Sequence, residues 1–79
     1  MEILLAYFGK APKYFNVTSR IKQDVINESI KNDYTFYDLG DPCSGVLKEL
    51  TIIYSSEGNI ITRVFPEATK GGVMSVNIP

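Results

Sequence analysis

The chain has 79 residues, 44% of them hydrophobic and 22% charged, which predicts one folded domain over residues 1–79 and excludes intrinsic disorder. Eight basic and nine acidic side chains give a formal net charge of −1 without a basic stripe, which argues against a nucleic-acid partner. The single cysteine, Cys43, excludes an internal disulfide framework and leaves either a buried, idle thiol or a cross-link between two chains.

The first predicted element is a strand over residues 3–8. Its side chains are apolar on both alternating faces, a pattern typical of a strand covered on both sides. Residues 9–16 contain Gly, Pro and Lys, which predicts a loop. The apolar run is too short to cross a membrane and lacks the basic start of a signal peptide, so we expect a soluble, cytoplasmic chain without membrane insertion.

Residues 17–30 change to a helical period. Ile21, Val25, Ile26 and Ile30 recur at steps of four, one and four, with polar residues between them. This pattern predicts one amphipathic helix of about three turns. Because isoleucine and valine have low helix propensity, the helix depends on packing against a sheet.

The second half of the chain predicts four strands. Residues 34–37 are aromatic or β-branched, and residues 39–45 are rich in turn formers. Residues 48–55 and 59–65 alternate on either side of a Gly-containing turn, which predicts a hairpin, and residues 74–78 alternate as a last strand. The order β-α-β-β-β-β predicts a small α+β fold, with a mostly antiparallel five-stranded sheet and one short helix.

Several short segments resemble a known family. The chain contains Ala6-Tyr7-Phe8-Gly9, Asn16-Val17-Thr18, Gly40-Asp41-Pro42-Cys43-Ser44-Gly45, Lys48-Glu49-Leu50, Ile53-Tyr54 and Ile78-Pro79. Together they resemble the small C-terminal domain of a J-protein of the mitochondrial outer membrane that is linked to cristae-organising complexes. Phe8 and Asn16 depart from that pattern, and the J-domain itself is absent. The resemblance implies a module for protein interaction or assembly and supplies no catalytic residues.

No group of residues specifies a chemical reaction. The chain has no histidine, which removes the commonest general base and transition-metal ligand. No phosphate-loop or cofactor motif is present either. We therefore expect a non-catalytic protein without a cofactor.

The turn around Asp41 is the candidate ligand site. Asp38, Asp41 and Ser44 supply oxygen atoms of the kind that calcium prefers. The competing interpretation is a tight turn in which Asp41 accepts local backbone hydrogen bonds. A cation here, together with the loop aromatics Tyr14 and Phe15, would suit a lectin-like protein with a carbohydrate ligand.

The hairpin carries apolar side chains on both sheet faces, and one helix covers only one face. Ile53, Ile60, Thr62 and Val64 therefore predict an exposed apolar surface, unless residues 9–16 and 66–72 cover it. The same role is expected of Tyr14 and Phe15 if they are exposed in their loop. The predicted function is an interaction or assembly module that binds a protein partner or itself as a homo-oligomer, with lectin-like ligand binding as the alternative.

Overall fold

The computed structural model describes residues 1–79 as six strands and two short helices. Their order is β1 (Glu2–Lys10), β2 (Lys13–Asn16), α1 (Thr18–Gln23), β3 (Ile30–Tyr34), α2 (Phe36–Leu39), β4 (Glu49–Ser56), β5 (Asn59–Pro66) and β6 (Met74–Ile78). All strand pairs are antiparallel, so the prediction of a small, strand-rich antiparallel fold is confirmed. The prediction of one five-stranded sheet with one helix is wrong, because there are two sheets and two helices.

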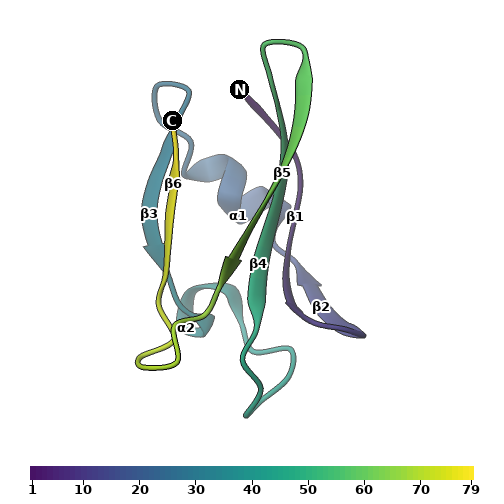
Figure 1. Cartoon of the computed structure of the whole chain (residues 1–79), viewed down its shortest axis with the longest axis vertical. Coiled ribbons are helices and arrows are strands. Elements are labelled where there is room, and N and C mark those ends of the chain that lie inside the picture. Colours follow the sequence, from purple (N-terminus) through teal and green to yellow (C-terminus); the bar gives the residue numbers. More distant parts are fainter.

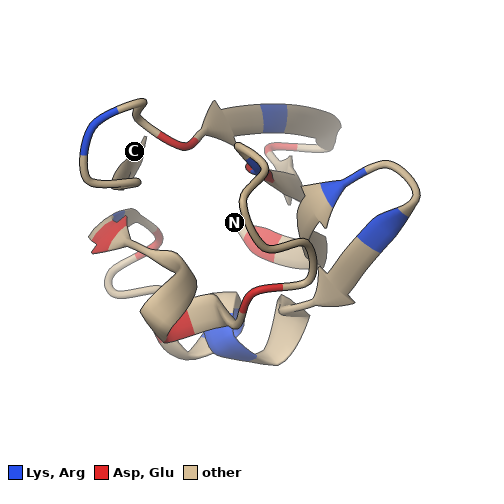
Figure 2. Ribbon diagram, turned by 90° about the horizontal axis from the view of Figure 1, so that it is seen from below, with Lys and Arg blue, Asp and Glu red and all other residues tan.

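The two sheets face each other across a single core (Figure 1). The larger sheet has the order β2-β1-β4-β5, and the smaller one pairs β3 with β6. Seen along the long axis, the elements surround a central space that the core side chains fill (Figure 2). The core comprises Ile3, Ala6, Phe8, Val17, Ile21, Ile30, Tyr34, Leu39, Leu50, Ile52, Tyr54, Phe65, Met74, Val76 and Ile78.

Strand β1 is covered on one face only, which corrects the expectation of a strand covered on both sides. A β-bulge between Ile3 and Leu5 inserts Leu4 and changes the phase of the alternation. As a result Ile3, Ala6 and Phe8 are buried, while Leu4 and Leu5 are exposed. A continuous apolar run hides such a phase change, since every residue in it is acceptable on the buried face.

Residues 13–16 form strand β2 rather than part of a loop. Lys10 pairs with Lys13 and Phe8 with Phe15, so the chain leaves β1 and returns along it as a hairpin. The aromatic pair Tyr14-Phe15 suits a strand, but Gly9 and Pro12 directed the sequence interpretation to a loop.

The predicted helix over residues 17–30 is observed only over Thr18–Gln23. Asn27 and Glu28 adopt positive φ angles of 52° and 65°, which reverse the chain between Ile26 and Ser29. Asn is one of the few residues that adopt this conformation readily. Ile30, expected on the helical stripe, instead begins β3 and is fully buried opposite Ile78 of β6.

The predicted strand over residues 34–37 is replaced by helix α2. Thr35 caps this helix: its hydroxyl accepts from the amide of Tyr37, and the Asp38 carboxylate accepts from the amide of Thr35 at 2.9 Å. The prediction used only the high β propensity of the aromatic residues and not the Thr-x-x-Asp spacing, which is that of a capping box.

The central hairpin agrees with the prediction. Strands β4 and β5 pair from Glu49–Pro66 to Ser56–Asn59, within one residue of the predicted bounds. Glu57 and Gly58 have φ angles of 52° and 81°, as a two-residue hairpin turn requires. The tip of this hairpin extends beyond the rest of the molecule (Figure 1). The alternation of β6 is also confirmed, with Met74, Val76 and Ile78 buried.

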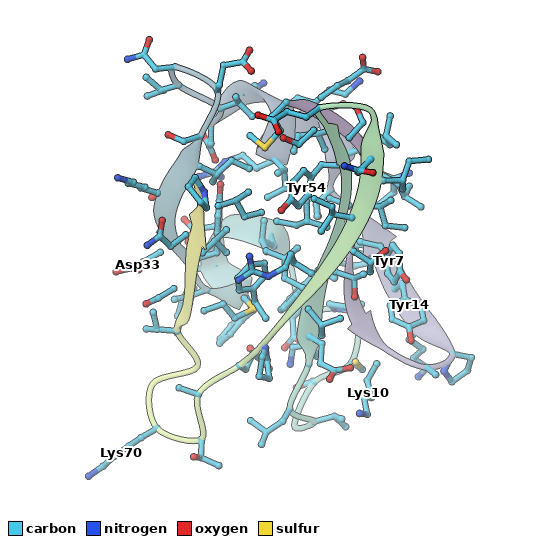
Figure 3. The ribbon with its side chains drawn as sticks, turned by 45° about the horizontal axis from the view of Figure 1, so that its top comes forward. Tyr7, Lys10, Tyr14, Asp33, Tyr54 and Lys70 are labelled. Atoms are coloured by element: carbon cyan, nitrogen blue, oxygen red, sulfur yellow. The ribbon has the colours of Figure 1, made fainter.

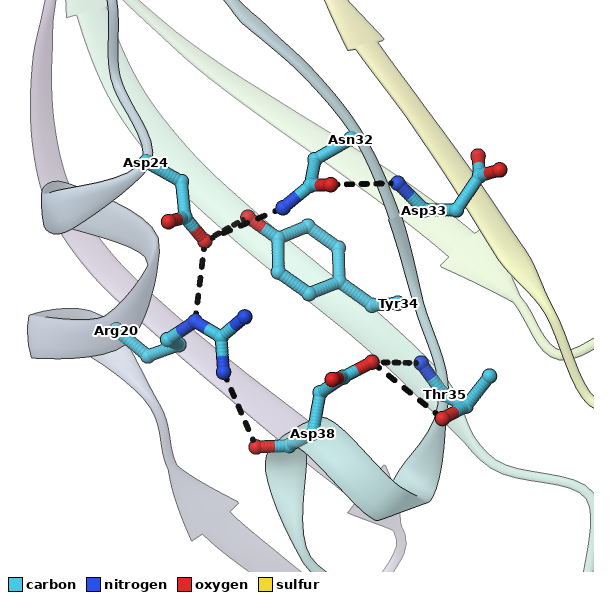
Figure 4. Close-up of polar contacts among 7 residues, drawn as sticks. All are labelled: Arg20, Asp24, Asn32, Asp33, Tyr34, Thr35 and Asp38. Carbon is cyan, nitrogen blue, oxygen red and sulfur yellow. Dashed lines mark hydrogen bonds and ion pairs between the residues drawn. The ribbon is translucent and has the colours of Figure 1, made fainter.

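A polar network fastens α1 to the smaller sheet (Figure 4). The Asp24 carboxylate accepts from the Tyr34 hydroxyl at 2.6 Å, the Arg20 guanidinium at 3.1 Å and the Asn32 amide at 3.4 Å. Burial alone would raise the pKa of Asp24. These hydrogen bonds and the charge of Arg20 lower the pKa by a larger amount, so it lies below its usual value. Burial and the bond to Asp24 raise the pKa of Tyr34 to about 12.

This network predicts a loss of stability in alkali. The Tyr34 hydroxyl holds its proton more tightly in the folded state than in the unfolded state, where its pKa is 10.0. Its contribution is therefore fully present below pH 10 and is lost as the pH rises from about 10 towards 12. We expect the Tyr34→Phe variant to be less stable by about 1 kcal/mol at neutral pH and to lack this part of the alkaline decline.

Urea unfolding of the Tyr34→Phe variant and the wild type between pH 7 and pH 12 measures this difference, with Tyr37→Phe as the matched control because Tyr37 is exposed. Parallel stability curves for the wild type and the Tyr34→Phe variant across this range would contradict the assigned role of Tyr34.

None of the helices is both long enough and apolar enough to cross a membrane.

Candidate interaction surface

The larger sheet has one face turned away from the core, which we call the outer face. Because side chains alternate along each strand, the register of the sheet determines its members. Its central members are Tyr14 of β2, Leu5 and Tyr7 of β1, Thr51 and Ile53 of β4, and Ile60, Thr62 and Val64 of β5, with Glu2 and Ser55 at one end and Glu49 at the other. Helix α1 packs on the opposite side, where Ile21 enters the core.

Large apolar side chains on the outer face remain exposed. Ile60 is 72% exposed, Val64 50%, Tyr14 46% and Leu5 37%. Residues 9–16 extend the sheet as its edge hairpin instead of crossing this face, and residues 67–73 lead from β5 to β6. The alternative in which these two segments cover the apolar face is therefore not observed. A contiguous exposed apolar face is typical of an interaction site.

The structure brings five of the six predicted interaction residues onto this face: Tyr14, Ile53, Ile60, Thr62 and Val64. Sequence reasoning missed Leu5 and Tyr7, which lie beside them on β1. The Tyr7 ring meets Tyr14 edge to face at 5.2 Å between centroids, and Figure 3 shows both on the side away from the β3–β6 pair. Only the pairing of β1 with β2 and β4 identifies these neighbours, and the sequence alone does not give that pairing.

Phe15 belongs to the other side of the sheet. It lies opposite Phe8, whose side chain enters the core, and its ring covers Gly40. A Cβ atom on Gly40 would lie 2.7 Å from the Phe15 ring. Tyr14 and Phe15 are both exposed, by 46% and 44%, as expected, but they lie on opposite sides of the sheet because successive residues of a strand point to opposite faces.

Strand β5 is a free edge of the larger sheet. Eight residues long, it carries Arg63 as its only charged side chain. The opposite edge, β2, has four residues, and its hairpin contains Lys10, Pro12 and Lys13. Charges, proline and shortness protect edge strands from pairing with other chains; β2 has all three, whereas β5 is twice as long and has one charge, Arg63, and a proline only at its last residue.

The Asp41 turn is organised around a buried lysine. Lys48 is 4% exposed, and its ammonium group lies 3.1 Å from Asp41 Oδ1 and 3.4 Å from Glu67 Oε1. It also donates to the carbonyls of Val46 at 2.7 Å and Cys43 at 3.3 Å. Burial alone would lower the pKa of Lys48. The carboxylates of Asp41 and Glu67 raise the pKa by a larger amount, so it lies above its usual value.

The three candidate cation ligands lie in different surroundings. Asp41 and Ser44 line a pocket of about 340 Å³ together with Lys48, whereas Asp38 caps α2. The positive charge facing Asp41 is therefore the lysine of the chain itself. No group of three or more acidic, Cys or His side chains is placed to hold a metal ion. Cys43 is a free, half-buried thiol. Lectin-like binding at this turn remains a prediction without a specific contact in its favour.

Charged side chains of both signs are spread around the molecule (Figure 2). Lys10 and Glu49 lie 3.9 Å apart near the β2 end of the larger sheet, while the loop before β6 carries Lys70, which points away from the body (Figure 3). The charged members of the outer face, Glu2 and Glu49, lie at its two ends, and its central members are uncharged. The centre of the outer face is therefore apolar and aromatic.

The resemblance to the J-protein domain remains a prediction about ancestry and assigns no role to a residue. Comparison of the chain with protein-family models, with curated proteins and with solved structures found no match.

Proposed function

We propose that this chain is a non-catalytic assembly module that associates with a second copy of itself at the outer face, through its edge strand β5. The observation that supports this most directly is the exposure of Ile60 and Val64 on β5, which is also a free edge of the larger sheet. Exposed strand edges with apolar side chains pair readily with other chains.

The size of the chain supports the same reading. A domain of 79 residues buries only about 60% of the surface that its unfolded chain exposes, so its stability margin is small. Contact of apolar residues such as Ile60 with a second copy would add stability in proportion to the apolar surface that it removes from water, about 25 cal/mol per Å². Self-association would then make thermal stability depend on protein concentration.

The Val64→Asp variant tests the proposal. We expect the wild type to form dimers with increasing concentration, and Val64→Asp to dissociate at least about tenfold more readily, because a two-fold contact repeats each substitution twice. Light scattering across a wide concentration range measures the mass. Ser75→Asp is the matched control, since it adds the same charge at an exposed position of β6.

The control variant should retain the wild-type association. A wild type that stays monomeric at every concentration would contradict the proposed function, as would a dimer that Val64→Asp leaves unchanged.

A further inference from the structure

We infer that two copies join through their β5 edges, in antiparallel register with Thr62 on the two-fold axis, to form one continuous eight-stranded sheet. The inference rests on the proposed self-association and specifies its geometry. It follows from the backbone of β5, from the side chains beside it and from the protection of the other edges.

The hairpin register determines which backbone groups of β5 are free. A two-residue hairpin closes with a hydrogen-bonded pair, here Ser56 with Asn59, and bonded and non-bonded pairs then alternate along the ladder. Ile60, Thr62 and Val64 occupy non-bonded positions opposite β4. Their N–H and C=O groups therefore point to the free edge, where a second strand would find three residues with unpaired donors and acceptors.

One antiparallel register matches these groups to those of a second copy. With Thr62 opposite Thr62 of the second copy, Ile60 lies opposite Val64 of the second copy and Val64 opposite its Ile60. Each of the three pairs exchanges two backbone hydrogen bonds. The same register places isoleucine beside valine on the outer face, and such apolar cross-strand pairs stabilise a sheet.

Neighbouring registers are less favourable. A shift of two residues in one sense places Arg63 opposite Arg63 of the second copy, which is a like-charge pair, and Ile60 opposite Pro66, which has no N–H. A shift in the other sense places Val64 opposite Gly58 in the hairpin turn, beyond the end of the strand. A shift of one residue would oppose free backbone groups to groups already bonded to β4.

The remaining edge strands are shorter than β5, which has eight residues, and the outward side chains of β3 and β6 are polar or charged. The outward side chains of β3 include Lys31 and Asp33, and those of β6 are Ser75 and Asn77, while β2 is short and flanked by lysines. Pairing of β5 with β5 closes the longest free edge. The expected assembly is therefore a dimer and not a fibre, because two-fold pairing leaves no second β5 edge to continue it.

Disulfide trapping tests the register in a Cys43→Ser background. Thr62→Cys should cross-link to itself under mild oxidation, because a hydrogen-bonded antiparallel pair has its Cα atoms about 5.5 Å apart, within reach of a disulfide. Val64→Cys alone should not cross-link, since the two thiols would lie roughly 14 Å apart along the strands. A mixture of Ile60→Cys and Val64→Cys should give the mixed dimer.

The two proposals fail in different ways. A dimer by light scattering without the Thr62→Cys cross-link, or with cross-linking of Val64→Cys to itself, would overturn the β5 register and leave self-association through the outer face intact. A chain that remains monomeric by light scattering in the wild type and in the unoxidised Thr62→Cys variant would overturn both.

Discussion

The Lys48→Met variant should lose about 3–5 kcal/mol of stability, which is a large share of the roughly 4–12 kcal/mol expected for a chain of this length. Methionine matches the length of the lysine stem but removes the charge that faces Glu67, whose side chain is also buried. The Glu67 carboxylate would then be desolvated without a cation. Its bond from the Lys48 amide, at 2.6 Å, would remain as its main compensation.

Urea unfolding monitored by circular dichroism measures this loss, and Lys70→Met is the matched control. Lys70 lies in the exposed loop before β6 and should change stability by less than about 0.5 kcal/mol when substituted. The double variant Lys48→Met/Glu67→Gln should be more stable than Lys48→Met alone, because a neutral amide is less costly to bury than an unpaired carboxylate. If Lys48→Met and Lys70→Met unfold at the same urea concentration, the buried lysine has no structural role.

The Gly9→Ala variant should lose about 3 kcal/mol and detach strand β2. A Cβ atom on Gly9 would lie 2.1 Å from the carbonyl oxygen of Lys13 and 2.9 Å from the Cα atom of Tyr14. Both neighbours are backbone atoms of β2, so relief requires the two strands to separate rather than a side chain to turn. The contact between the Tyr7 and Tyr14 rings depends on that pairing and should be lost as well.

Gly45→Ala supplies the comparison for Gly9→Ala. Gly45 has a φ of +77° but nothing within 4 Å of an added Cβ, so its substitution costs only backbone strain, of about 1–2 kcal/mol. Chemical denaturation ranks the two variants, and nuclear Overhauser contacts between Tyr7 and Tyr14 report directly on the hairpin. Equal stability losses with an intact tyrosine contact would show that the β1–β2 pairing tolerates a side chain at Gly9.

Several predictions failed where two local preferences competed. Ile30 was predicted as the end of the helix because it lies four residues after Ile26, yet it begins β3, where it is buried opposite Ile78, about fifty residues away in the chain. Thr35 to Asp38 carry both a capping box and strongly β-forming aromatics, and the cap prevailed. Short-range propensities of about 1 kcal/mol or less do not decide such contests when burial of one side chain contributes more.

The part of the candidate surface that lies on β4 and β5 was predicted correctly, because it depends only on side-chain alternation within one hairpin. Alternation along β4 and β5 places Ile53, Ile60, Thr62 and Val64 on one face whatever else the chain does, because the strand period is two residues. Leu5 and Tyr7 join that face only through pairing with β4, and a bulge at Leu4 sets their phase. Lys48 gave no signal in the sequence, since its partners Asp41 and Glu67 meet only after the chain has folded.

The sequence by itself determined a small antiparallel, strand-rich domain, the β4–β5 hairpin with its Gly58 turn and the inward alternation of β6. Each of these follows from patterns within about twenty residues, where side-chain period and turn chemistry act directly. Tertiary structure decided how the strands divide between two sheets, which face of β1 is covered and that β5 is left as the free edge. These depend on contacts between distant segments, and only packing around one shared core selects among the locally acceptable alternatives.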